Sequence, residues 1–191
     1  MKRLAILGGI LALAAPLALA QTSTWVSDPN HSEVDFSITH MSVSKVHGRF
    51  GGVKATIVYN QADVTKSTVT ATIGIGTVDT GVESRDQDLK STDFFNIDAI
   101  PTATFSSTSV AKNGSHLTVT GNLTLHGVTR PVVLDVEGPN GSMTDPVGHV
   151  HTGFSATTTI DRTAFGIGTR FPATLLGDMV ALDIELEAIK Q

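Results

Sequence analysis

Apolar and polar side chains alternate along most of the chain from Glu33 onward. In residues 33–40, Val34, Phe36 and Ile38 fall on one side of an extended chain, and acidic or hydroxyl side chains fall on the other. This period of two is typical of a half-buried β-strand. The alternation returns at residues 53–59, 67–75, 103–107, 116–125, 130–137, 153–161 and 179–188. With a short leading strand near Trp25, the pattern predicts about eight or nine strands.

Two segments depart from this alternation. Residues 41–48 read MSVSKVHG, and we expect one helical turn there, before Gly48. Residues 82–95 carry charges at mixed spacing, and we expect a short helix followed by a loop. Turn-forming residues separate the strands, notably Gly127 and residues 138–141. Because no low-complexity linker divides residues 21–191, we expect them to form a single domain.

An antiparallel meander with one apolar face must bury that face. It does so by closing into a barrel or by stacking two sheets, and the pattern alone fits both. A barrel of about eight strands either fills with side chains or holds one small apolar ligand. Aromatic residues make up only 5% of the chain, and the apolar faces are rich in Val, Ala, Ile and Gly. The composition therefore favours an underfilled interior, which is a pocket.

The first twenty residues indicate a secretory signal peptide. Lys2 and Arg3 precede an apolar run, and small residues lead to a cleavage site after Ala20. The run is short and is interrupted by Gly8, Gly9 and Pro16, so we expect no membrane span in the mature form. We therefore expect a periplasmic or secreted protein. Cysteine is absent, so its stability must come from the sheet and not from disulfides.

The charge balance argues against nucleic acid as a partner. The chain has 13 Lys and Arg against 18 Asp and Glu, a net charge of −5 at pH 7. Nucleic-acid binding comes from neutralising phosphates with basic side chains, and no basic cluster exists here.

Histidines are the first candidates for chemistry. His40 has the same parity as Phe36, so we expect it to point inward near a strand end, either receiving a ligand head group or bonding the backbone. His31, His40 and His47 are separated by nine and seven residues, which defines no metal-binding face on one element. His149 and His151 form an H-x-H pair of the kind that ligates zinc or copper. Since no further ligand completes the set in sequence, we interpret them as surface histidines and expect no metal.

An enzyme is the alternative that the charged segment leaves open. Arg85 and Asp86, together with His40, would supply the acid and base of a hydrolase or isomerase. Mixed charges around a short helix are usually solvated or mutually paired, so we expect no catalytic residue. No nucleophile elbow of the form G-x-S-x-G is present.

Four stretches of the chain, in this order, resemble the sequence blocks of a known family. They are DPNHSEVDFSITHMSVSKVHGRFGG from residue 28, VESRDQDLKSTDFFNIDAIPTATFSS from residue 82, GNLTLHGVTRPVVLDVEG from residue 121 and FSATTTIDRTAFGI from residue 154. From about Trp25 to Ile189 the chain resembles the YceI-like family of secreted, lipocalin-shaped lipid-binding proteins. One position departs: family members often have histidine where this chain has Asp88.

The resemblance implies an all-β fold, an antiparallel lipocalin-like barrel with one or two short helices around a long apolar tunnel. It also implies a polyisoprenoid or another long amphiphile as ligand, and a homodimer. We therefore expect a carrier that holds an isoprenoid or quinone-like lipid without catalysis or a resident cofactor. A packed, stress-related module without a ligand remains a further alternative.

The residues expected to bind the ligand face inward along the strands or lie at the open end of the barrel. Phe94, Phe95, Phe165 and Phe171 lie in charged or glycine-rich loops, where exposed aromatics would be costly. We therefore expect them to cover the open end of the barrel or to enter its core, with residues 93–95 and 163–171 forming its mouth. The expected ligand-binding residues are Phe36, Ile38, His40, Ile57, Ile73, Phe94, Phe105, Leu134, Phe154, Phe165 and Ile184.

Overall fold

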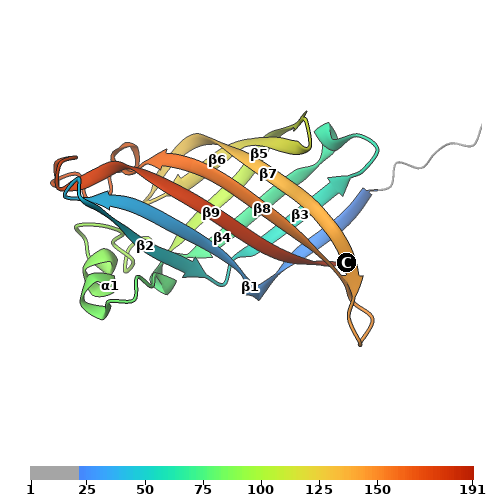
Figure 1. The fold of residues 1–191 in the computed structure, drawn as a ribbon, viewed down its shortest axis with the longest axis horizontal. Helices are drawn as coiled ribbons and strands as arrows, with labels where there is room; N and C mark the ends of the chain where they lie inside the picture. The colour runs from blue at the N-terminus through green and yellow to red at the C-terminus, as the bar shows by residue number, and fades with distance from the viewer. Residues whose placement is uncertain (1–21) are drawn as a thin grey trace, which may run out of the picture.

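The computed structural model describes residues 22–191, so the expected signal peptide lies outside the described residues. The described part is almost entirely antiparallel β-structure (Figure 1). The strands are β1 (Thr22–His40), β2 (Ser44–Gly51), β3 (Lys54–Asn60), β4 (Thr68–Gly74), β5 (Thr102–Asn113), β6 (His116–Leu125), β7 (Val128–Thr144), β8 (Val150–Asp161) and β9 (Leu176–Lys190). The helix α1 (Glu83–Lys90) and the 3₁₀ turns Val64–Lys66, Ile75–Thr77 and Arg162–Phe165 interrupt them.

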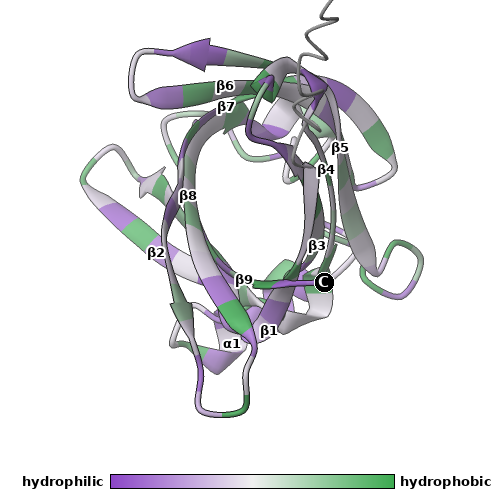
Figure 2. Cartoon of the chain, turned by 90° about the vertical axis from the view of Figure 1, so that its right-hand side faces the viewer, coloured by the Kyte–Doolittle hydropathy of each residue, from purple (hydrophilic) through white to green (hydrophobic). Residues whose placement is uncertain are grey.

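The strands close into a barrel. From β3 to β9 each strand pairs with the next, and β1 pairs with both β3 and β9, which completes a ring of eight (Figure 2). The ninth strand, β2, pairs with the second half of β1. The structure thus confirms the barrel and excludes the two-sheet sandwich that the pattern also allowed.

A large irregularity in β1 lets this strand serve two neighbours. Its first half, through Val26, pairs with β3, and its second half, from Glu33, pairs with β2. Between Ser27 and Ser32 the register with β9 shifts. Pro29 lies inside this bulge, where its missing N–H costs no ladder hydrogen bond.

The helical turn expected at residues 41–48 is wrong. Met41 and Ser42 form a turn with φ values of 51° and 57°, and β2 begins at Ser44. The apolar side chains of β2 do alternate, as Val46 and Phe50 show, but Gly48 interrupts the pattern between them. The ring of Phe36, directly opposite on β1, covers Gly48: a Cβ at this position would lie 2.5 Å from the Phe36 ring. The space that a side chain would fill at Gly48 is thus taken by the neighbouring strand.

The short helix expected within residues 82–95 is confirmed as α1. It lies at one end of the barrel (Figure 1). Among residues 22–191, no helix is long and apolar enough to cross a membrane.

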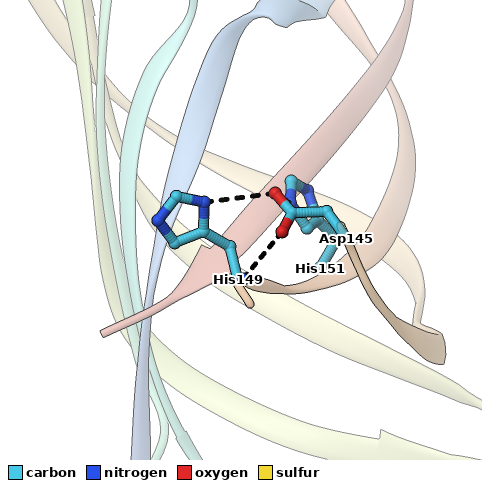
Figure 3. Close-up of side chains that lie close together, drawn as sticks. All are labelled: Asp145, His149 and His151. Carbon is cyan, nitrogen blue, oxygen red and sulfur yellow. Dashed lines mark hydrogen bonds and ion pairs between the residues drawn. The ribbon is translucent and has the colours of Figure 1, made fainter. Parts of the chain in front are cut away.

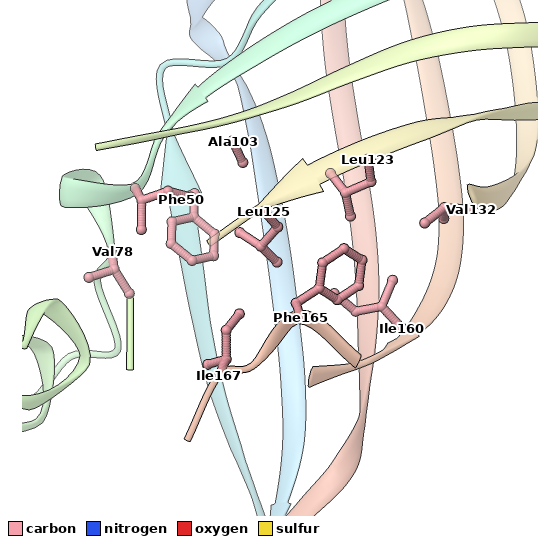
Figure 4. Close-up of a cluster of buried hydrophobic side chains, with 10 residues drawn as sticks. Phe50, Val78, Ala103, Leu123, Leu125, Val132, Ile160, Phe165 and Ile167 are labelled. Atoms are coloured by element: carbon pink, nitrogen blue, oxygen red, sulfur yellow. The ribbon is translucent and has the colours of Figure 1, made fainter. Parts of the chain in front are cut away.

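The buried side chains form separate clusters along the barrel. The largest lies toward the α1 end and includes Phe50, Leu125, Ile160 and Phe165 (Figure 4). Two smaller clusters lie farther along, one around Trp25 and the other around Val119 and its neighbours. Phe105 and Leu134 pack against both the largest cluster and the one around Val119.

Candidate functional site

Two apolar cavities lie inside the barrel. The larger, of about 430 Å³, lies at the α1 end and falls in the range of about 300–1,000 Å³ typical of ligand pockets. The second, of about 140 Å³, lies toward the opposite end. Four side chains line both: Val34, Ile73, Leu123 and Leu182. Because they share these walls, the two cavities adjoin along the barrel, and we refer to them together as the path.

The structure places ten of the eleven expected ligand-binding residues on this path. The larger cavity is lined by Phe36, Ile38, His40, Ile73 and Phe94. The smaller cavity is lined by Ile57, Ile73, Phe105, Leu134, Phe154 and Ile184. Phe165 is the exception, because it lies on neither wall and is only 2% exposed within the packed cluster of Figure 4.

His40 takes a position at the rim. It is the last residue of β1, is exposed, and lines the larger cavity. Its strand partners are Ser44 on β2 and Leu176 on β9, after an irregularity in register at Ile38. The parity argument placed His40 inside the barrel, but the strand ends there and leaves the ring near solvent.

The two segments expected at the mouth contact each other. The rings of Phe94 and Phe171 stack with centroids 5.3 Å apart and an interplanar angle of 14°. Arg170 Nη2 lies 2.6 Å from Asp93 Oδ2, and its guanidinium lies 4.7 Å from the centroid of the Phe171 ring. Residues 93–95 and 163–171, which we call the mouth, thus meet at the open end of the larger cavity.

A buried arginine organises one side of the mouth, and the sequence analysis did not identify it. The Arg162 side chain is 3% exposed and its guanidinium donates to five backbone carbonyls and one carboxylate. The acceptors are the carbonyls of Ile167, Gly168, Phe171, Leu176 and Gly177, and Asp178 Oδ1, at 2.7–2.9 Å. Arg162 therefore fixes the loop that carries Phe171. The only signal in sequence was its place inside a family-like block, since the acceptors converge only in the folded loop.

Asp161 begins the same loop. The Thr163 hydroxyl donates to Asp161 Oδ1 (2.6 Å), and the Thr163 backbone N–H donates to the same oxygen (2.8 Å). These hydrogen bonds, the hydroxyl first, hold the pKa of Asp161 below its ordinary value of 3.8.

Of the residues considered for catalysis, His40 and Arg85 both line the larger cavity, whereas Asp86 does not. Asp86 Oδ1 accepts from the backbone N–H and the hydroxyl of Thr80, at 2.9 and 2.6 Å. Arg85 donates to the hydroxyl and carbonyl oxygens of the same threonine, at 2.7 and 2.8 Å. Arg85 and Asp86 thus hold the segment that enters α1, while His40 lies on the β1–β2 hairpin.

Polarity changes along the path. Charged side chains line the larger cavity at the α1 end, namely Arg85, Asp88, Asp93, Arg162 and Arg170. The smaller cavity is lined almost wholly by apolar side chains, with no charged residue among them. A polar entrance above an apolar interior matches a ligand with a polar head and a long apolar tail.

A wider hollow of about 1,120 Å³ lies on the outside of the barrel. Its walls include outward-facing polar residues such as Asp35, Thr157 and Asp183. It is open to solvent, so it lacks the enclosure that an apolar ligand needs.

Comparison with known proteins gives matches over nearly the whole described chain. A YceI-like domain model matches residues 25–188. Protein YceI of Salmonella newport is 39% identical over 162 residues, which cover 84% of this chain and 83% of that protein.

Solved structures show the same fold. BcnA of Burkholderia cenocepacia superposes with a TM-score of 0.73 at 22% identity, over 84% of this chain and 98% of that one. A polyisoprenoid binding domain from Saccharophagus degradans, implicated in plant cell wall breakdown, superposes with a TM-score of 0.61 at 15% identity, over 90% of this chain and all of that one. Fold, family model and sequence identity agree, and the chain belongs to the YceI-like domain family.

Proposed function

We propose that this protein is a periplasmic or secreted carrier that holds a long isoprenoid or another amphiphilic lipid in its barrel and makes no covalent bonds to it. The apolar path of the two cavities carries the proposal, because it is enclosed by side chains that offer a ligand little besides apolar contact. A structurally similar domain is described as binding polyisoprenoids, which supports the same ligand class.

The shape of the path favours a chain over a compact ligand. A cavity of about 140 Å³ behind one of about 430 Å³ admits a slender tail beyond a wider entrance. Burying each methylene contributes roughly 0.8 kcal/mol, so a dozen buried carbons contribute on the order of 10 kcal/mol before the costs of association. A lipid can therefore bind tightly with few polar contacts.

The two rival functions have less support in the structure. An enzyme using His40, Arg85 and Asp86 would need these groups around one reacting atom, whereas Arg85 and Asp86 both bond Thr80. A packed module would need a filled barrel, whereas the interior contains two cavities. The homodimer that the family resemblance implies stays a prediction, which sedimentation analysis would test.

Native mass spectrometry of tag-free protein purified without detergent tests the proposal. We expect a mass above that of the chain, which solvent extraction removes and identifies as a polyprenyl or quinone-like lipid. Protein refolded from denaturant should bind one added long-chain polyprenol. A bare mass before extraction, together with no uptake after refolding, would refute the carrier function.

A further inference from the structure

A cluster of histidines and carboxylates lies at the end of the barrel opposite α1. The hairpin that joins β7 to β8 projects there (Figure 1), with Asp145 in its turn and His149 and His151 just beyond. Asp145 Oδ2 lies 3.1 Å from His149 Nδ1 and 3.2 Å from His151 Nε2 (Figure 3). These three side chains place their potential ligand atoms within 4.8 Å of one another.

The turn itself positions the carboxylate. The backbone N–H groups of Val147 and His149 donate to Asp145 Oδ1, at 2.9 and 2.8 Å. The Asp145 N–H donates to the His149 carbonyl (2.9 Å), which closes the loop. One carboxylate oxygen is therefore occupied by the backbone, and the other, Oδ2, is directed toward the two rings.

Glu187 orients the second ring. Its Oε1 lies 2.7 Å from His151 Nδ1. In the tautomer that has its proton on Nδ1, the ring donates to this carboxylate, and Nε2, the nitrogen that faces Asp145, keeps a free lone pair for a metal ion. A carboxylate behind a ligating histidine is the usual way in which proteins select the tautomer that binds a metal.

From this geometry we infer that Asp145, His149 and His151 form a zinc site, with Glu187 as the positioning residue. Ligands held about 2.0–2.1 Å from a tetrahedral ion lie about 3.3 Å apart, so the two distances from Asp145 Oδ2 are close to those of a coordinated ion. Two imidazoles and one carboxylate are a ligand set that suits Zn²⁺. The site does not depend on what occupies the barrel.

The site leaves room for a fourth ligand. The His149 side chain is 60% exposed, and those of His151 and Asp145 are 21% and 26% exposed. His151 and Asp145 also line a surface hollow of about 690 Å³. A three-residue site with a solvent position differs from a closed structural site, in which the protein supplies all four ligands.

Further groups that could bind a cation lie beside the site. On the other side of Glu187, His31 Nδ1 lies 3.8 Å from Glu187 Oε2. Asp28 belongs to the same group, so a third histidine and another carboxylate border the site.

Calorimetric titration of tag-free, chelator-treated protein with ZnCl₂ tests this inference. We expect one equivalent to bind, binding to weaken at least tenfold in His149→Ala and His151→Ala, and Glu187→Gln to weaken it 10- to 100-fold without changing the stoichiometry. His116→Ala is the matched control, because His116 also pairs with a carboxylate, Asp135 (3.0 Å), but on β6 and outside the cluster. It should bind zinc like the parent protein.

Nuclear magnetic resonance supplies a second readout that does not rest on the variants. Added Zn²⁺ should shift the ring signals of His149 and His151 and leave those of His116 unchanged. His149 is exposed in the hairpin, so His149→Ala should unfold at the same temperature as the parent protein without metal. Absence of zinc binding in the parent, or binding that survives in the His149→Ala/His151→Ala double variant, would overturn the inference.

Discussion

The ring of Phe94 stacks on the ring of Phe171, although the two residues are 77 positions apart in the chain. Phe94 follows α1, and Phe171 belongs to the loop that Arg162 holds in place. Since both line the larger cavity, this stack joins the two sides of the mouth and narrows the path by which a ligand enters.

Loosening this stack should open the mouth. Phe171→Ala removes the ring pair, worth about 0.5–1.5 kcal/mol beyond its buried area, and the contact with Arg170. Amide exchange should become up to about tenfold faster in residues 93–95 and 163–171, since about 1.4 kcal/mol is a factor of ten. Val133→Ala, on the exposed side of β7, is the control and should leave both segments unchanged. Equal protection in Phe171→Ala and the parent would show that the stack does not hold the mouth.

Arg162 should be worth far more to stability than an exposed arginine. In Arg162→Lys the ammonium has three donors in place of a planar fork, so several buried carbonyls lose their partners. We expect a loss of about 3–5 kcal/mol in the free energy of unfolding, because each buried acceptor left without a partner costs about 1–3 kcal/mol. Arg130→Lys is the matched control, because Arg130 is exposed and donates a single bond to Ala164 O (3.2 Å); it should cost less than about 0.5 kcal/mol. Equal denaturant midpoints for the two variants would contradict the role of Arg162.

Gly121 should not tolerate a side chain. A Cβ at this position would lie 2.7 Å from the carbonyl oxygen of Ser106 and closer still to the Phe105 ring, and the backbone contact cannot be relieved by ring movement. Gly121→Ala should therefore destabilise the protein by about 1–3 kcal/mol in denaturant unfolding. Gly51→Ala meets nothing within 4 Å and should be close to neutral. An equally stable Gly121→Ala variant would mean that Phe105 does not lie across the glycine.

Gly48 shows which strands could be predicted from the sequence and which could not. Strands whose apolar side chains alternate without interruption, such as the one with Val34 and Phe36, were predicted correctly because the pattern records burial directly. At Gly48 an aromatic ring from the neighbouring strand takes the place of a side chain, so the alternation failed and β2 was missed. Aromatic cover of a glycine is a property of strand pairing, which a single sequence does not reveal.

The residues that line the path could be predicted where they lie on regular strands, because alternation gives the direction of each side chain there. Inward residues of regular strands, such as Ile57 and Ile184, follow from parity, and they line the path. Phe165 lies in a 3₁₀ turn, where parity does not apply, and its ring enters the core and lines neither cavity. Arg162 and Asp145 act through loops that fold back on themselves, so their partners are not periodic in sequence.

The acid titration of Asp161 should report on the start of the mouth loop. Its pKa is lowered in the folded state, so the stability that it contributes is present above 3.8 and is lost as the pH falls through the folded value. Thr163→Val removes the hydroxyl that donates the first of its hydrogen bonds. The Asp161 pKa, measured from its carboxyl carbon by nuclear magnetic resonance, should rise toward 3.8. Thr159→Val, at an exposed site on β8, should not change it, and an unchanged value in Thr163→Val would exclude the hydroxyl as the cause.

The hollow barrel is tested most directly by filling it. Ala71 lines the smaller cavity opposite Phe105, whereas Thr72, one residue along β4, is exposed. We would measure denaturant unfolding and polyprenol uptake on both Ala71→Phe and Thr72→Phe. Together the two measurements distinguish a barrel with a cavity from a barrel with a packed core. The account predicts that Ala71→Phe keeps the parent's stability and loses uptake, while Thr72→Phe keeps both. A loss of about 1–3 kcal/mol in Ala71→Phe, the cost of overpacking a filled core, or undiminished uptake by it, would contradict the account.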